Sequence, residues 1–289
     1  MTVTKKAIVF LAITFAISWT ALIGGWLKGQ ALMSIGNKSG SDVGTLMILG
    51  PLVGAVVCTM AFERGRRIEA LGLRFKPNWW WIGAALVPIV PAALSVALTL
   101  LLSDRIFVGI VAGGKAIARA WQAQGLDARG AGLLLVGLFV QLTLTEELGW
   151  RGYLHHLWRP FGFWRTSLAT GLVWGAWHLP AVVLFGLGYP GHPVLGAFLY
   201  PLWTMLLAPL FTVLRERGRS IWAPGICHAV IDGGIAGLAV TTLSNPTFPW
   251  NGLVGIGGFI ALALLNLAIF LLRLDRPSVA LAQDRRLPQ

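Results

Sequence analysis

The amino-acid sequence predicts an all-α membrane protein, a polytopic bundle of about eight transmembrane helices with both termini in the cytoplasm. Hydrophobic residues make up 56% of the 289 residues and charged residues only 12%, and the mean hydropathy is +0.73. This composition is far from that of a soluble globular domain. Apolar runs of about 20 residues recur along the chain, which is the length that crosses a hydrocarbon core about 30 Å thick.

Eight segments have the length and composition of membrane-spanning helices. The first follows Lys5 and Lys6, and because its apolar run is too long for the core of a signal peptide, we interpret it as a retained helix. The whole chain, 1–289, reads as a single integral-membrane domain that ends in a mobile cytoplasmic tail over 274–289. The predicted spans are 7–27, 43–62, 79–103, 131–150, 166–186, 194–214, 220–241 and 252–273.

The longest predicted connection between spans runs from about 104 to 130 and lies on the outer side. It contains Gly113-Gly114, followed by a stretch from Lys115 to Gln124 with the composition of a short surface helix.

Positive charge sets the predicted orientation. The chain carries a formal net charge of +12, which by itself would also suit a nucleic-acid-binding protein. Of its 23 Lys and Arg residues, however, 17 fall in segments that eight spans and a cytoplasmic N-terminus place inside. Such an excess is what the positive-inside rule expects. The charge therefore indicates topology and contact with anionic membrane lipids, and we expect no nucleic-acid partner.

The two cysteines, Cys58 and Cys227, lie in separate predicted spans, far apart in the sequence. A disulfide framework is not expected from this arrangement. We interpret both as packed apolar thiols.

The fourth span carries the first cluster of ionisable residues, Glu146, Glu147 and Arg151. Such groups are costly in hydrocarbon unless they pair or face a polar cavity, so they suggest function. Glu147 and Arg151 are four residues apart with the acid first, the favoured order for an ion pair on one helical face. Glu146 lies on a neighbouring face, free to point into the bundle. A structural alternative is that both glutamates only mark the cytoplasmic end of a helix.

Two later spans each add a histidine. His178 lies among apolar residues, and Pro180 is expected to break the helix just after it. In the seventh span His228 and Asp232 are four residues apart and share a face. The structural alternatives are a packed histidine in the first case and a private His–Asp hydrogen bond in the second.

These groups fall at similar depth, toward the cytoplasmic half of the membrane, when each helix rises about 1.5 Å per residue. Carboxylates and imidazoles that converge there are the components of a site that activates water. A general base takes the proton of water, and a neighbouring donor or metal stabilises the oxyanion formed at a carbonyl.

Three motifs on separate spans give the chain a resemblance to a known family. Glu146-Glu147-Leu-Gly-Trp-Arg151, Trp174-Gly-Ala-Trp-His178 and His228-Ala-Val-Ile-Asp232 resemble the E-E-x-x-x-R, aromatic-x-x-x-H and H-x-x-x-N/D motifs of the CPBP family of intramembrane proteases, which includes CAAX proteases and bacteriocin-processing enzymes. Each motif alone is short, while their joint order is fairly specific. The resemblance covers about 141–235 and says little about the first 130 residues.

The resemblance implies a role for each motif residue. Glu146 would activate water, His178 would help to hold it, and Glu147 with Arg151 would orient the site. His228 and the residue four positions later would stabilise the oxyanion. The family's eukaryotic prenyl endopeptidases have asparagine at that position, whereas this chain has Asp232. A carboxylate donates a hydrogen bond only when protonated, so Asp232 is expected to be held neutral by burial, to orient His228 or to ligate a metal.

The resemblance implies an intramembrane endopeptidase that acts on a lipid-modified, prenylated or membrane-embedded peptide. The charge pattern and compactness of the chain favour a prokaryotic plasma membrane as its location. No cofactor is required by this interpretation. Zinc remains an alternative, because two imidazoles and two carboxylates are suitable ligands. Two other functions stay open: a proton-coupled transporter, since intramembrane ionisable residues also form proton relays, and a noncatalytic immunity or scaffold protein with the same fold. The oligomeric state is not predicted.

Overall fold

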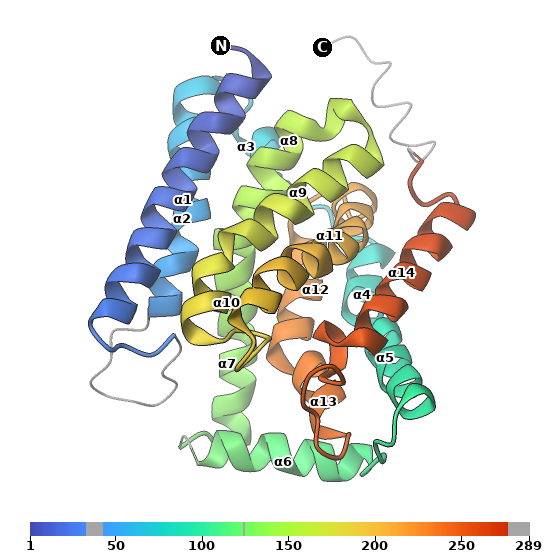
Figure 1. Cartoon of the computed structure of the whole chain (residues 1–289). Coiled ribbons are helices and arrows are strands. Elements are labelled where there is room, and N and C mark those ends of the chain that lie inside the picture. Colours follow the sequence, from blue (N-terminus) through green and yellow to red (C-terminus); the bar gives the residue numbers. More distant parts are fainter. Residues whose placement is uncertain (33–42, 124, 277–289) are drawn as a thin grey trace.

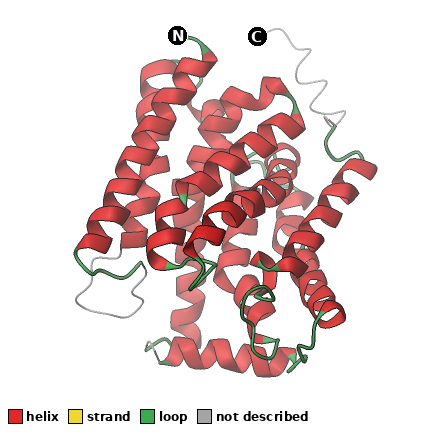
Figure 2. Ribbon diagram, in the orientation of Figure 1, coloured by secondary structure: helices red, strands yellow, loops and turns green. Residues whose placement is uncertain are grey.

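A computed structural model describes residues 1–32, 43–123 and 125–276. The structure is 77% helical, and in these residues no strand forms, only an isolated bridge between Phe107 and Leu243 (Figure 2). The predicted all-α class is therefore confirmed. Most of the predicted tail, 277–289, lies outside the described residues.

The chain begins with two long helices that form a hairpin on one flank of the bundle (Figure 1). They are α1 (Val3–Leu27) and α2 (Val43–Phe62), and the short α3 (Arg67–Ala70) follows them. The third crossing consists of α4 (Trp79–Leu86) and α5 (Ile89–Leu102), which are separated at Pro88. Proline interrupts a helix because it lacks the N–H donor and its ring clashes with the preceding turn.

Helix α6 (Ile110–Gln122) lies across one end of the bundle, nearly perpendicular to most of the other helices (Figure 1). It contains most of the stretch predicted to form a short surface helix, and begins five residues earlier than predicted. The next crossing is one continuous helical segment: α7 (Ala128–Leu142), the π-helix η1 (Thr143–Leu154), α8 (His155–Trp158) and the 3₁₀ turn η2 (Arg159–Phe161).

The fifth crossing is α9 (Phe163–Trp177) and α10 (Leu179–Phe185), and the sixth is α11 (Pro193–Arg217). The seventh combines α12 (Trp222–Val230), the π-helix η3 (Ile231–Ile235) and α13 (Ala236–Thr241). A 3₁₀ turn, η4 (Gly252–Val254), leads into the final helix, α14 (Ile256–Leu271).

Within the described residues, seven helical segments are long and apolar enough to cross a membrane, and they correspond to the first seven predicted spans. The predicted eighth span is present as α14, which is apolar but shorter, at 16 residues. Helix α1 starts and α14 finishes at the same end of the bundle (Figure 1). This agrees with an even number of crossings, while the assignment of that end to the cytoplasm remains a prediction.

One predicted boundary is wrong. The fourth span was expected to end at residue 150, but its helix continues to Phe161. The polar residues that lowered the hydropathy after 150 are accommodated inside the bundle: Arg151 is 2% exposed and His155 5%. Tertiary packing therefore extended the helix where composition predicted an end, and Glu146 lies farther from that end than expected.

Small residues let the central helices approach closely, as is common where helices pack in membranes. Gly171 and Gly175 of α9 lie against the backbone of α11, and a side-chain carbon at Gly171 would contact the Cα of Met205. Gly225 of α12 packs against Thr143 at the start of η1 in the same way. These contacts bring α9, α11, α12 and η1 together at the centre of the molecule.

Candidate active site

The Glu-Glu-x-x-x-Arg motif lies in η1, a π-helical segment of 12 residues. Such segments are rare and are frequent at functional sites. Its three ionisable side chains point inward, since Glu146 is 4% exposed, Glu147 0% and Arg151 2%. The alternative in which the glutamates reach water at a helix end is therefore wrong.

Glu147 is the centre of a buried ionic network. Its Oε1 accepts hydrogen bonds from Arg151 Nη1 at 3.0 Å and from His228 Nδ1 at 2.8 Å. The predicted ion pair four residues apart is confirmed, and a second contact joins η1 to α12. A buried carboxylate is costly unless it is paired, so Glu147 is expected to keep both partners. Its bond to His228 fixes the orientation of that ring relative to η1, the segment that carries Glu146.

Aromatic rings hold the guanidinium of Arg151 from two directions. Its Cζ lies 4.3 Å from the ring centroid of Trp174 and 4.2 Å from that of Phe211. Cations are attracted to the faces of such rings, and the planar guanidinium is well suited to stack on them. Phe211 belongs to α11, which carries none of the three motifs.

Trp174 also holds the predicted base. Its indole Nε1 donates a hydrogen bond of 2.8 Å to Glu146 Oε2. The sequence interpretation treated Trp174 only as aromatic packing in place of phenylalanine, and it missed this donor. A buried indole N–H usually finds an acceptor, so a tryptophan four residues before an intramembrane histidine was an available signal.

His178 lies at the break between α9 and α10, with Pro180 in the first turn of α10. The predicted interruption of the helix is confirmed. His178 Nδ1 lies 2.9 Å from the carbonyl oxygen of Trp174, an acceptor, so Nδ1 carries the proton and Nε2 has the free lone pair. The ring packs against Trp177, with centroids 4.6 Å apart, and against Tyr200, at 5.0 Å.

His228 has a carboxylate near each ring nitrogen. Besides the contact of Nδ1 with Glu147, Nε2 lies 3.5 Å from Asp232 Oδ2. This arrangement suits a ring with protons on both nitrogens. The ring also packs edge-on against Trp174, with centroids 5.4 Å apart, and against Phe211, at 5.5 Å.

Asp232 differs from the other five predicted residues because its side chain is 47% exposed. It lies in the second π-helical segment, η3. The exposed fraction of the side chain does not show the burial that was expected to keep this carboxyl group neutral, and its protonation state stays a prediction. The alternative in which Asp232 orients His228 agrees with the contact between them.

The structure thus brings the three motifs together around Trp174, which contacts Glu146, Arg151, His178 and His228. It adds three aromatic residues that the motifs did not identify as contacts: Phe211 and Tyr200 from α11, and Trp177 from α9. Cys58 and Cys227 are buried free thiols, as predicted.

The donor set for a metal is incomplete. Within the described residues, no three His, Cys, Asp or Glu side chains are grouped so that they could hold a metal ion. The residues as arranged do not fit zinc, and we derive no step that uses it.

Comparison with known proteins supports the motif-based resemblance. Residues 129–234 match the family model described as type II CAAX prenyl endopeptidase Rce1-like. The matched range includes all six predicted site residues. Among curated proteins, none matches the chain.

Proposed function

We propose that the Rce1-like segment of this integral membrane protein, residues 129–234, is the catalytic part of an intramembrane endopeptidase that cleaves a peptide bond with a glutamate-activated water. The observation that carries the proposal is the arrangement around Trp174. Its indole N–H holds one oxygen of Glu146, and its carbonyl accepts the hydrogen bond of His178.

Glu146 is the base in this proposal. The hydrogen bond from Trp174 occupies Oε2, which leaves Oε1 as the oxygen that accepts the proton of water. His178 presents Nε2 as an acceptor, because its Nδ1 proton is directed to the Trp174 carbonyl. A water held by these two acceptors is oriented with its oxygen lone pair available for attack on a carbonyl carbon.

His228 stabilises the oxyanion. With protons on both nitrogens it is a cationic donor, held by Glu147 on one side and Asp232 on the other. Charge placed in advance where negative charge develops is among the strongest contributions to catalysis in a site from which water is largely excluded. Asp232 orients the ring, and its exposed carboxylate can move aside when the carbonyl oxygen arrives.

The substrate in this proposal is a membrane-associated peptide, either lipid-modified or membrane-embedded. The support is that the six residues lie within helical segments long and apolar enough to cross a membrane, surrounded by apolar side chains. We place the protein in a prokaryotic plasma membrane, as the charge distribution and compact size suggest. No observation favours the transporter or scaffold alternatives over hydrolysis.

The proposal is tested with purified protein and a panel of membrane-bound and prenylated peptides, with cleavage detected by mass spectrometry. Glu146→Gln is expected to fold with an unchanged melting temperature and to lose at least 100-fold in turnover, because the amide cannot accept the proton of water. Glu69→Gln is the matched control, since Glu69 pairs with Arg66 at the surface.

Equal turnover in Glu146→Gln and the wild type would remove Glu146 from the mechanism. No cleavage of any peptide by the wild type, together with proton-coupled uptake in vesicles, would favour the transporter. No activity in either assay, with retained peptide binding, would favour the scaffold.

A further inference from the structure

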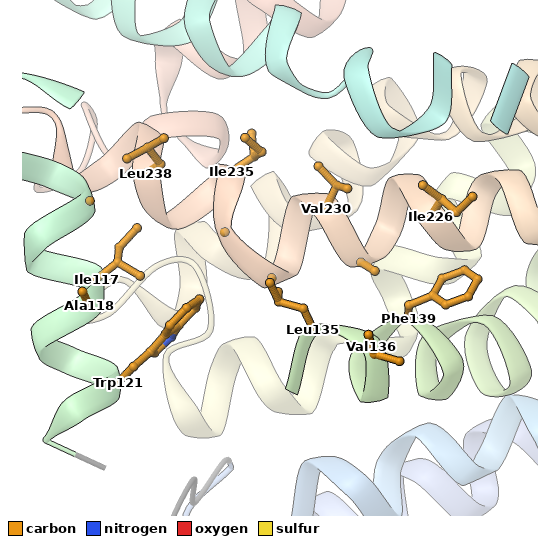
Figure 3. A pocket seen from close by; sticks show the side chains of 14 residues that line it. Ile117, Ala118, Trp121, Leu135, Val136, Phe139, Ile226, Val230, Ile235 and Leu238 are labelled. Atoms are coloured by element: carbon orange, nitrogen blue, oxygen red, sulfur yellow. The ribbon is translucent and has the colours of Figure 1, made fainter. Parts of the chain in front are cut away.

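Two neighbouring apolar cavities share a wall at η3 and α13, next to α6. The larger, about 650 Å³, is lined by α6, α7, α12, η3 and α13 (Figure 3). The smaller, about 330 Å³, is lined mainly by α5 and α13 and by Ile110 at the start of α6. Ile235 and Leu238 line both cavities, so they form a ridge that separates two neighbouring apolar spaces.

The length of each cavity is close to the thickness of one half of the hydrocarbon core of a membrane. The wall of the larger cavity runs from Ile226 to Leu238, about 18 Å along the helix axis. In the smaller cavity the wall on α5 runs from Ile89 to Leu100, about 17 Å. Half of a hydrocarbon core is about 15 Å thick, which is the depth that the chains of one leaflet occupy.

Helix α6, which lines the larger cavity, also carries positive charge. Gly114, Ile117 and Trp121 face the larger cavity, whereas Lys115 and Arg119 are exposed on another face of the same helix. Helix α6 contacts α13, where Gly113 packs against Thr242 near the end of that helix. Long basic side chains on an amphipathic helix at this level attract anionic lipid headgroups.

From these observations we propose that one anionic diacyl phospholipid binds here, with one chain in each cavity and its phosphate at Lys115 and Arg119. Each cavity would hold one acyl chain, and the glycerol that links the chains would lie over the shared ridge. The basic residues of α6 would bind the phosphate group. The lipid completes the apolar contacts of η3, the segment in which Asp232 lies.

Binding is measured with lipid-depleted protein in a neutral detergent, by native mass spectrometry and by thermal unfolding. The probes are dioleoyl phosphatidylglycerol, dioleoyl phosphatidylcholine and single-chain lysophosphatidylglycerol. We expect one bound phosphatidylglycerol, held at least tenfold more tightly than either other lipid, and a melting temperature that rises with it. Equal affinity for phosphatidylcholine would overturn the role of the cations, and equal affinity for the single-chain lipid would overturn binding in both cavities.

Two variants distinguish lipid bound in these cavities from lipid that covers the membrane-facing surface without a specific site. Gly234 lines the larger cavity and has open space where a side chain would project, so Gly234→Leu fills the cavity without a clash. Gly137 of α7 also has open space but does not line either cavity, so Gly137→Leu is the matched control. Gly234→Leu is expected to weaken binding at least tenfold and Gly137→Leu to leave it unchanged.

The second cavity and the cations are tested in the same assay. Ala97→Leu fills the smaller cavity and is expected to weaken binding independently of Gly234→Leu. The double variant Lys115→Gln, Arg119→Gln is expected to bind phosphatidylglycerol no better than phosphatidylcholine, whereas Lys28→Gln, at the end of α1, keeps the preference. Wild-type binding by both cavity-filling variants would show that the lipid does not occupy these cavities.

Discussion

At the scale of single residues, Trp174 organises the candidate site. It donates to Glu146, accepts from His178 through its carbonyl and lies against Arg151 and His228. The motif position required only an aromatic residue, and phenylalanine would supply the ring without the N–H. The hydrogen bond to Glu146 therefore exists because this chain has tryptophan, not phenylalanine, at position 174.

Trp174→Phe tests this hydrogen bond. The variant keeps an aromatic ring but leaves Glu146 free to rotate, so we expect turnover to fall about tenfold with little change in KM, consistent with the loss of about one charge-assisted hydrogen bond. Trp177→Phe is the matched control, because Trp177 Nε1 is buried without a hydrogen-bond partner in the described part of the chain. Similar losses in both variants would mean that the ring volumes, not the donor, matter.

Asp232→Asn tests the position where the chain departs from the prenyl endopeptidases. The amide oxygen can still accept from His228 Nε2, so we expect activity within about tenfold of wild type. Asp232→Ala, which keeps no acceptor, is expected to lose more. Activity should also survive prolonged chelation, measured with the metal content of the same sample. Parallel loss of a stoichiometric metal and of turnover would instead identify a metal-bound water as the nucleophile.

At the scale of elements, the site depends on how closely η1 approaches α12. Gly225 of α12 allows that approach, because a side-chain carbon there would overlap Oγ1 of Thr143. Thr143 begins η1, which carries Glu146 and Glu147, and Gly225 is three residues before His228. The separation of these two elements therefore sets the distance between the proposed base and the proposed oxyanion donor.

Gly225→Ala is expected to reduce stability and activity together. Overpacking in a well-packed interior costs about 1–3 kcal/mol, and the shift would lengthen the contact between His228 and Glu147. Gly137→Ala is the control, since its site on α7 is open. Thermal unfolding and turnover are measured on both, and Thr143→Ala added to Gly225→Ala should recover part of the loss. An unchanged melting temperature in Gly225→Ala would show that the helices adjust without cost.

At the scale of the whole molecule, basic residues gather at the end of the bundle where α1 starts and α14 finishes. Side-chain contacts join the connections there: Lys6 pairs with Glu63 at 2.6 Å, and Trp164 donates to Asp275 at 2.9 Å. Helix α6 lies at the other end (Figure 1). The positive-inside rule predicts that the first end is cytoplasmic.

Single cysteines test this orientation. In a background with Cys58 and Cys227 replaced by alanine, Arg64→Cys marks the first end and Arg119→Cys marks α6. A membrane-impermeant maleimide is expected to label Arg119→Cys in intact cells and Arg64→Cys only in inverted vesicles. The opposite pattern would invert the predicted topology and place the basic connections outside.

The sequence by itself determined the helical class, the order of the crossings and the identity of the ionisable residues in them. In hydrocarbon every backbone polar group must be satisfied within its own segment, so apolar runs of the right length predict helices directly. The Glu147–Arg151 pair was also predictable, because residues four apart on a helix are neighbours whatever the remainder of the fold does.

Only the tertiary structure decided the features that depend on distant segments. The contact of His228 with Glu147 and the stacking of Phe211 on Arg151 join residues that are far apart in the sequence. The fourth crossing continues to Phe161 because neighbouring helices bury its polar residues. The exposure of Asp232 and the two cavities beside α13 likewise arise from which helices meet. Such contacts follow from packing among helices, about which local periodicity carries no information.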